Sequence, residues 1–330
     1  MTTTTLSEDA FLATVQPMRR ELLAHCYRML GSVHEAEDLV QETLLRAWRA
    51  LDGFENRSSV RTWLYRIATN ACLTALEGRA RRPLPTGLGA PADPEGELHQ
   101  HPEVAWVEPV PDEVLWGRAP DDPAAAAVDR ESVRLAFVSA LQHLTGQQRA
   151  VLVLRDVLAW HADEVADALG LSVGAVTSTL QRARAHLRRV HEAGGTAAPL
   201  TPDDPRVGAL LDAYVDAFER YDVERIVSLL TADAVWDMPP YTDWYEGADA
   251  IGRLIRTHCP AGGPESIRMV RTRANGSPAL GLYMLAPDGV HRAFQLQHLT
   301  VTADGVAAVT AFFDTSLFRV FGLPAELPVT

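Results

Sequence analysis

Two short segments of the chain carry side chains that suit the binding of nucleic acid. In the first, a polar loop over residues 54–60 begins with the aromatic Phe54 and is followed by Arg61, Arg66 and Asn70. An unpaired base is held by an aromatic or apolar wall, by amide groups that meet its edge and by arginines that bind the backbone. This segment offers all three. A solvated loop whose Phe54 packs into a helical core is the alternative.

The second segment, residues 161–189, has the layout of a helix-turn-helix. Apolar side chains recur along both halves at helical spacing, Gly170 between them can adopt the positive φ that ends a helix, and Ser172 can cap the next one. An ordinary helical hairpin with a solvated arginine face is the alternative. The second half also displays polar side chains that can reach base edges or phosphates in a major groove, namely Thr177, Ser178, Gln181 and Arg182.

These segments lie in two helical blocks separated by a linker. Apolar residues recur every three or four positions over residues 7–80, which predicts a small helical bundle. Residues 83–123 are rich in Pro, Gly and acids without a sustained period, which is typical of a linker. After the second helical block and a further Gly- and Pro-containing break at residues 192–205, helices give way to alternating runs. The C-terminal third is therefore expected to be α+β.

The charge of the chain is unevenly distributed. A formal net charge of −13 would disfavour nucleic acid, because binding a polyanion depends on basic side chains. However, residues 55–82 carry six arginines against two acids, and residues 129–191 carry eight against six. Residues 83–128 carry nine acids and one arginine, and residues 201–330 carry seventeen acids and ten arginines. Two basic blocks are thus separated by an acidic linker.

Composition excludes several classes of protein. The chain is 47% hydrophobic and 22% charged, which is typical of a folded globular protein. No apolar run is long enough to span a membrane and the first residues lack a signal-peptide pattern, so we expect a cytoplasmic protein. The three cysteines, Cys26, Cys72 and Cys259, lack metal or redox spacing, which predicts reduced thiols, no metal and no cofactor.

Residues 27–82 closely resemble region 2 of the extracytoplasmic function (ECF) sigma factors, a subfamily of the sigma-70 family, and residues 144–189 resemble their region 4. The resemblance rests on the motifs A-E-D-L-V-Q-E-T, R-T-W-L-Y-R-I-A-T-N and S-V-G-A-V-T-S-T-L-Q-R-A-R, in that order. It implies two all-α sigma domains, the second with a helix-turn-helix, at residues 7–82 and 129–191. The acidic linker, residues 83–128, is then expected either to thread through polymerase or to be a solvated tether.

The resemblance also implies site residues. Region 2 would contact the β′ clamp coiled coil of core polymerase through one helix face formed by Asp38, Gln41, Glu42, Leu45 and Arg46. The following loop would capture a flipped base of the −10 element with Phe54, Asn56, Arg57, Arg61 and Asn70. Region 4 would bind the −35 element with Ser172, Thr177, Ser178, Gln181, Arg182, Arg184 and Arg188. Core positions are expected for Trp48, Trp63 and Leu64. Affinity for the −35 element is expected to be weak, because two positions that are often basic in relatives are Thr177 and Thr179.

Residues 206–322, after a second linker at 192–205, look like a SnoaL-like domain, the cone-shaped α+β fold shared with ketosteroid isomerases and nuclear transport factor 2. Such a cone normally encloses a pocket, and the candidates to line it are Tyr214, Trp236, Asp237, Met238, Trp244, Tyr245, His298 and Asp314. Isomerase relatives place a carboxylate base near Asp237. In the alternative interpretation the aromatics are core, Asp237 ends a strand and His298 is a satisfied buried histidine.

The sequence thus predicts a sigma factor, not an enzyme, that directs promoter-specific initiation and is modulated by its own SnoaL-like domain. The expected partners are core RNA polymerase, through its β′ clamp and β flap, promoter DNA and an anti-sigma factor. The SnoaL-like domain is expected to contact the sigma domains within the chain, and no membrane is involved. The alternatives are a helix-turn-helix regulator that does not bind core polymerase and a sigma-like protein fused to an isomerase- or hydrolase-type domain.

Overall fold

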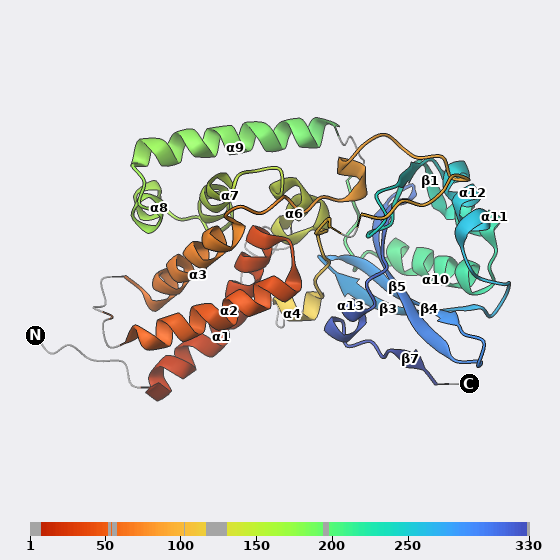
Figure 1. Ribbon diagram of the computed structural model, residues 1–330, viewed down its shortest axis with the longest axis horizontal. Helices are drawn as coiled ribbons and strands as arrows, with labels where there is room; N and C mark the ends of the chain where they lie inside the picture. The colour runs from red at the N-terminus through yellow and green to blue at the C-terminus, as the bar shows by residue number, and fades with distance from the viewer. Residues whose placement is uncertain are drawn as a thin grey trace, which may run out of the picture. The chain divides into compact units, whose positions relative to one another are not determined.

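The computed structural model describes residues 8–51, 54, 58–101, 103–116, 131–193 and 198–328, which form two compact units (Figure 1). The first, here called the helical unit, comprises residues 1–81 and 113–195. The second, the cone unit, comprises residues 82–112 and 196–330. In the described residues no helix is long and apolar enough to cross a membrane.

Three helices form the first half of the helical unit: α1 (Glu8–Leu30), α2 (Val33–Arg49) and α3 (Val60–Leu76). Gly31 makes the turn between α1 and α2 with a φ of 72°, a value that glycine adopts without strain. Ser32 and Ser59 cap α2 and α3, because their hydroxyl oxygens accept hydrogen bonds from the amides of Glu35 and Thr62. The predicted small helical bundle is present.

The second half contains α6 (Leu135–Leu141), α7 (Gly146–Leu152), a π-helical turn η3 (Val153–Val157), α8 (Ala162–Leu169) and α9 (Val173–Ala193). Gly170 ends α8 with a φ of 65°, and the Ser172 hydroxyl caps α9 by accepting from the amide of Ala175 at 3.2 Å. Both roles follow the sequence prediction. The pair α8–α9 is the expected helix-turn-helix.

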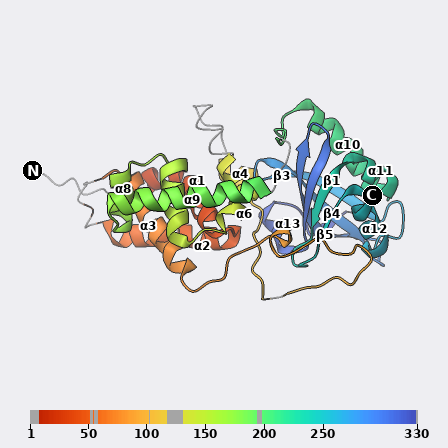
Figure 2. The same ribbon diagram turned by 90° about the horizontal axis from the view of Figure 1, so that it is seen from above.

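The cone unit is a mixed sheet with three helices over one face (Figure 2). The helices are α10 (Pro205–Glu219), α11 (Val223–Leu229) and α12 (Ala248–His258). The strands are β1 (Leu230–Asp237), β2 (Trp244–Glu246), β3 (Ile267–Ala274), β4 (Ser277–Leu285), β5 (His291–Thr302) and β6 (Gly305–Phe312), in the spatial order β2-β1-β6-β5-β4-β3. The α+β prediction is confirmed.

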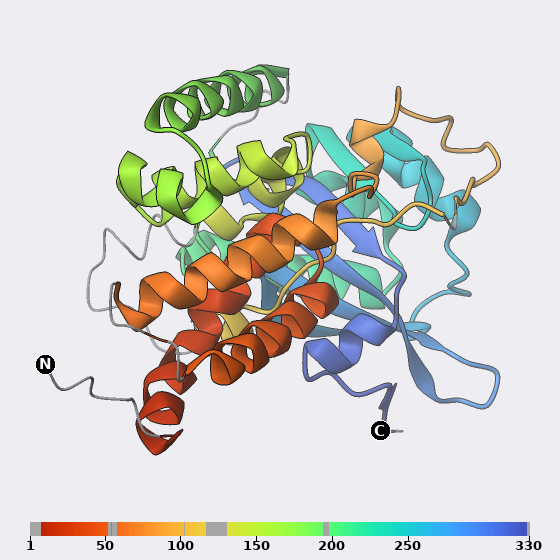
Figure 3. The same cartoon turned by 60° about the vertical axis from the view of Figure 1, so that its left-hand side comes forward.

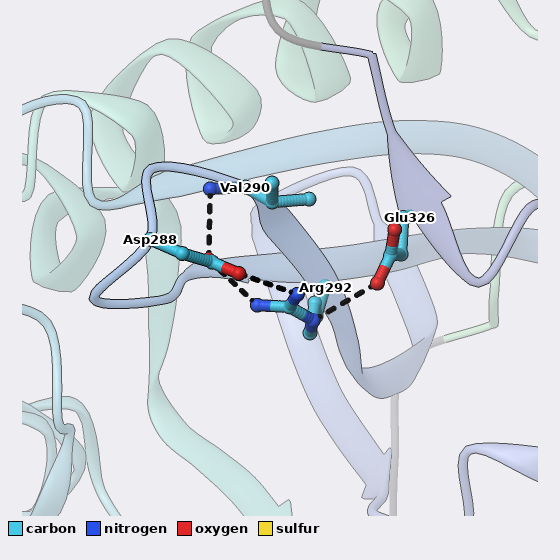
Figure 4. Close-up of polar contacts among 4 residues, drawn as sticks. All are labelled: Asp288, Val290, Arg292 and Glu326. Atoms are coloured by element: carbon cyan, nitrogen blue, oxygen red, sulfur yellow. Dashed lines mark hydrogen bonds and ion pairs between the residues drawn. The ribbon is translucent and has the colours of Figure 1, made fainter.

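The C-terminal end of the chain is attached to the sheet. Helix α13 (Ser316–Val320) follows β6, and the short strand β7 (Glu326–Leu327) pairs with β5. Figure 4 shows the ion pairs that fix β7, in which the guanidinium of Arg292 binds Glu326 at 2.9 Å and both carboxylate oxygens of Asp288 at 2.7 Å. These paired acids hold the pKa of Arg292 above its usual value.

Residues 82–112, which we call the strap, belong to the cone unit and not to a free linker. The strap includes the short helical turn η2 (Pro85–Gly87), and the helix α4 (Asp112–Trp116) begins at its end. In Figure 3 the strap is the orange trace beside β1 and α12. The expectation of a linker over residues 83–128 is therefore corrected for residues 83–112. A segment rich in Pro, Gly and acids shows no periodic apolar pattern from which packing could be predicted. In the structure, however, prolines and valines of the strap are buried, among them Val107 and Val110.

Candidate functional site

The helical unit carries a groove of about 390 Å³ between α1 and α2. Its lining residues are Val15, Gln16, Arg19, Gln41, Leu44, Leu45 and Trp48. Four of these residues lie on α2 and are separated by three, one and three positions, so they share one face of the helix: Gln41, Leu44, Leu45 and Trp48. Leu45 is 56% exposed and Trp48 37% exposed, which is unusual for large apolar side chains.

The groove contains two of the five residues predicted to contact polymerase, Gln41 and Leu45. The carboxylate of Glu42 binds Arg46 at 2.6 Å on the exposed surface of α2, and Asp38 is exposed one turn earlier. The prediction that Trp48 fills the bundle core is wrong, because its side chain lines the groove. Its spacing of three residues from Leu45 was the signal that could have placed it there.

Of the predicted −10 residues, Arg61 and Asn70 lie on α3, and Phe54 lies before it. The ring of Phe54 packs on Trp63 with ring centroids 4.7 Å apart. The guanidinium of Arg61 binds Glu21 at 2.9 Å and lies 5.0 Å from the centre of the Tyr65 ring. Asn70 is exposed on the same helix, whereas Asn56 and Arg57 lie outside the described residues.

Helix α3 also contacts the second half of the helical unit. The ring of Tyr65, buried in α3, meets Trp160 edge-on with centroids 6.3 Å apart. Nearby, the guanidinium of Arg66 binds the carboxylate of Asp167 on α8 at 3.0 Å. The helix that bears the candidate −10 residues is thus packed against the helix-turn-helix half of the chain. Sequence reasoning missed Trp160 and Asp167, because nothing in either segment identifies a partner a hundred positions away.

A buried arginine joins the same two halves. Arg149 on α7 is 3% exposed, and its guanidinium donates hydrogen bonds to the main-chain oxygen of Met29 at the end of α1 and to Gln142 Oε1 at 2.8 Å. It also donates to the carbonyl of Leu144 at 3.3 Å. Burial lowers the pKa of Arg149 to about 10. The guanidinium remains charged at neutral pH, so its acceptors compensate for the loss of hydration.

Helix α9 displays the predicted −35 residues along one exposed surface. Thr177 and Gln181 are exposed, Ser178 is half-buried, and the exposed arginines are Arg182, Arg184 and Arg188. Thr179 faces the inside of the domain, where it is 3% exposed, so it cannot meet DNA as an outward residue. Arg184 is bound by both oxygens of Asp156 on η3, at 2.6 and 2.9 Å, and this pairing raises the pKa of Arg184.

In the cone unit, strand register divides the candidate pocket residues between the two faces of the sheet. Neighbouring residues of a strand point to opposite faces, and residues paired across strands share a face. Trp236 and its cross-strand partner Tyr245 lie in the core beneath the helices. The hydroxyl of Tyr214 joins this core and donates to Gln297 Oε1 at 3.0 Å. Met238 belongs to the same core.

Asp237 and His298 lie on the opposite face. On this face of the sheet, cross-strand pairing places four residues in one row, in the order Trp244, Asp237, Thr310 and His298. Asp314 is outside both faces, exposed, and accepts a hydrogen bond from the amide of Ser316. The prediction that these residues line one pocket is therefore wrong. Asp237 does not face the cone interior, where a catalytic base would have to act.

The strap contacts the end of this row formed by Trp244 and Asp237. The amide of Thr86 donates to Asp237 Oδ1 at 3.0 Å, and Trp244 Nε1 donates to the carbonyl of Gly89 at 3.0 Å. Further along, the amide of Ala92 donates to the carbonyl of Trp244 at 2.8 Å. Burial raises the pKa of Asp237 to about 7, and the hydrogen bond from Thr86 opposes that shift only in part.

Comparison with known proteins agrees with this division of the chain. The profile described as Sigma-70 region 2 matches residues 14–82, the profile described as Sigma-70, region 4 matches residues 134–187, and the profile of the SnoaL-like domain matches residues 211–305. The ECF RNA polymerase sigma factor SigG of Mycobacterium tuberculosis is 58% identical over 318 residues, which cover 96% of this chain and 85% of that protein. The chain belongs to the ECF sigma factors.

A second relative in this family, SigJ of Mycobacterium tuberculosis, is 30% identical over 250 residues, which cover 73% of this chain and 70% of that protein. Its crystal structure matches 95% of this chain and 100% of that chain with a TM-score of 0.61 and 25% identity. The order of two helical sigma domains followed by a SnoaL-like domain is therefore shared with another ECF sigma factor. Both relatives are named as sigma factors, and neither name describes an enzyme.

Proposed function

We propose that this ECF sigma factor recruits core RNA polymerase through the groove between α1 and α2 and directs it to promoters through α3 and α9. The exposed apolar pair Leu45 and Trp48 carries the proposal, since apolar side chains at the centre of a docking surface supply most of its binding energy. A partner helix laid into this groove, as in a clamp coiled coil, would bury both side chains. Around them Asp38, Gln41 and the Glu42–Arg46 pair would form a polar rim.

The proposal extends to promoter DNA. Single-stranded −10 DNA would meet Phe54, Asn56, Arg57, Arg61 and Asn70, and the −35 duplex would meet Ser172, Thr177, Ser178, Gln181, Arg182, Arg184 and Arg188. Arg61 and Arg184 are each bound to a carboxylate of the chain, so phosphate would have to displace Glu21 and Asp156. The polymerase β flap and an anti-sigma factor are further proposed partners.

For the SnoaL-like domain we propose regulation of the sigma domains and no catalysis. The candidate base, Asp237, lies on the sheet face that the strap covers. In the interior, the described residues leave Trp236 Nε1, Tyr245 OH and Gln297 Nε2 without a hydrogen-bond partner, and a bound water or a ligand with acceptor atoms would satisfy them. Sensing of a small ligand by these groups is a second candidate role for the domain.

In-vitro transcription with purified core polymerase tests the sigma activity. We expect promoter-specific transcripts with the full chain and a loss of at least about fivefold at limiting concentration with Leu45→Ala, because deleting a buried leucine at a docking surface costs about 1–3 kcal/mol. Leu285→Ala is the matched control, since this leucine is 41% exposed and lies in the cone unit. The absence of promoter-specific transcripts from every genomic fragment tried would favour a regulator that does not bind core polymerase.

A further inference from the structure

The exposed side of helix α9 changes in character along its length. Positions three or four apart share one face of a helix, and one such series on α9 consists of Val173, Thr177, Gln181, Arg184 and Arg188. All five residues are exposed. This surface, which we call the α9 face, therefore begins with two β-branched side chains that carry methyl groups. It continues with an amide and ends with two guanidinium groups.

The first residue of the α9 face is an apolar one that the −35 prediction does not include. Val173 is 48% exposed, so its methyl groups are available to a partner outside the domain. The next residue, Gly174, has no side chain. Among the described residues, nothing outside the adjoining helical turn would lie within 4 Å of a Cβ atom placed there. The surface beside Val173 is thus open, and a partner can approach the helix closely at this end.

The hydroxyl groups at this end of α9 are bound to the helix itself. The hydroxyl of Thr177 donates to the carbonyl of Val173 at 3.0 Å, and the hydroxyl of Ser178 donates to the carbonyl of Ala175 at 3.1 Å. The hydroxyl of Ser172 accepts from the amide of Ala175 as the helix cap. A hydroxyl that donates to a main-chain carbonyl has used its only proton. Thr177 therefore presents its methyl group outward and has no proton to donate to a base.

A surface of methyl groups suits one feature of the DNA major groove. Each A·T pair carries there the C5-methyl group of thymine, which is contacted by apolar side chains and by the methyl group of threonine. Guanine instead presents two acceptors, which an arginine binds best. No arginine precedes Arg182 in α9. Because the N-terminal residues of a recognition helix meet the base edges, the bases at this end of α9 would meet methyl groups and no guanidinium group.

The other end of the α9 face fits the phosphate backbone. Arg184 and Arg188 are exposed two and three turns beyond Thr177. Guanidinium groups bind phosphate oxygens and fix the register of a protein on the duplex, whatever the sequence. A duplex held by these two arginines can present its groove to the beginning of the same helix. The charge of the α9 face is therefore complementary to double-stranded DNA and not to an apolar partner.

We propose that Val173 and Thr177 determine promoter specificity by contacting thymine methyl groups in the −35 element. The −35 element then contains at least one A·T pair where it faces the beginning of α9. The amide of Gln181, one turn further on, can bind the edge of an adenine there. The inference rests on the proposed sigma function, because it assigns the DNA sequence that the helix-turn-helix recognises.

Replacement of thymine by deoxyuridine tests these contacts directly, because deoxyuridine pairs like thymine and lacks only the C5-methyl group. The probe is a genomic promoter fragment that gives specific transcripts with the full chain and core polymerase. Each thymine of its −35 element is replaced in turn. We expect replacement at one or two positions to lower the affinity of the holoenzyme by about fourfold, as for the loss of about one buried methyl group. Val173→Ala should abolish this discrimination at one of these positions.

Two substitutions of Thr177 separate its methyl group from its hydroxyl group. Thr177→Val keeps methyl groups and removes the hydroxyl, so the affinity and the discrimination between thymine and deoxyuridine should both remain. Thr177→Ser keeps the hydroxyl and removes the methyl group, so it should lower the affinity for the thymine probe by about fourfold and abolish the discrimination. Arg188→Ala is the matched control on the α9 face, since it should weaken binding to both probes by the same factor.

Three results would overturn the proposal. They are a −35 element without thymine on either strand, an affinity that is insensitive to deoxyuridine at every position, and a loss with Thr177→Val as large as the loss with Thr177→Ser. In each case the promoter-specific transcripts persist, so the sigma function stands. A complete absence of such transcripts from every fragment would instead contradict the sigma function, and with it the assignment of α9 to a −35 element.

Discussion

The buried carboxyl group of Asp237 makes a prediction about stability and pH. In the folded cone its pKa is about 7, whereas the ordinary value for an aspartate is 3.8. The folded state therefore holds this proton over a pH range in which the unfolded chain has lost it. The contribution of Asp237 to stability is present in full below pH 3.8 and is lost as the pH rises through 7.

The magnitude follows from the size of the shift. About three pH units correspond to about 4 kcal/mol across the whole range, at about 1.4 kcal/mol per unit. Between pH 5.5 and pH 8 the loss is about 2 kcal/mol. In Asp237→Asn this side chain is neutral at every pH. Between pH 5.5 and pH 8, the free energy of unfolding of the variant cone should therefore fall by about 2 kcal/mol less than that of the wild-type cone. Asp233→Asn, on the exposed surface of the same strand, should keep the wild-type slope.

The cysteines of the chain allow the two units to be followed separately. Cys259 lies in the cone unit, whereas Cys26 and Cys72 are buried in the helical unit. Burial raises the pKa of Cys259, which slows its alkylation in the folded state. Pulsed alkylation along a urea gradient, with mass spectrometry of the cysteine peptides, then yields an unfolding curve for each unit. Equal pH slopes for Cys259 in the wild type and in Asp237→Asn would refute the reasoning.

Three further predictions concern the helical unit and the fusion. Arg149→Met leaves the carbonyl of Met29 and the amide oxygen of Gln142 without their donor, and should destabilise the helical unit by about 2–4 kcal/mol in the Cys26 and Cys72 curves; a loss below 0.5 kcal/mol would contradict that role. Asp156→Ala frees Arg184 for phosphate, so the salt dependence of binding to a −35 duplex, measured by fluorescence anisotropy, should steepen by about 0.9 in log–log slope; an unchanged slope would show that Arg184 does not reach the DNA. Deleting residues 196–330 should change transcription output and leave binding to core polymerase intact; unchanged output would remove the regulatory role.

Much of the helical unit could be predicted because its determinants are local. The helix-turn-helix is defined by a glycine at the end of α8, a serine cap on α9 and apolar side chains at helical spacing, and all three are present in the structure. Such signals act over one or two turns, so a single sequence displays them. The contacts of Arg66 with Asp167 and of Tyr65 with Trp160 join positions about a hundred residues apart, which no local pattern indicates.

The strap was missed for a different reason. Its principal contacts use main-chain groups, such as the amides of Thr86 and Ala92 and the carbonyl of Gly89. Every residue type carries the carbonyl acceptor, and every type except proline carries the amide donor. A composition of Pro, Gly and acids therefore suits a docked strap as well as it suits a solvated tether. The error over the pocket was avoidable, since Trp236 and Asp237 are adjacent in a strand and must point to opposite faces.

The distribution of charge offers a test of how the cone affects transcription. The cone unit carries 23 acids and 11 arginines, whereas the helical unit carries 20 and 19, so nearly all of the net charge lies in the cone unit. A tethered acidic domain repels promoter DNA at low ionic strength, and this repulsion is screened as salt rises. An effect of the cone that acts through packing and short hydrogen bonds is not weakened by salt in this way. If inhibition by the cone, measured as the ratio of transcription without and with residues 196–330, shrinks between about 50 and 200 mM salt, charge repulsion dominates; a ratio that does not shrink would contradict charge repulsion as its cause.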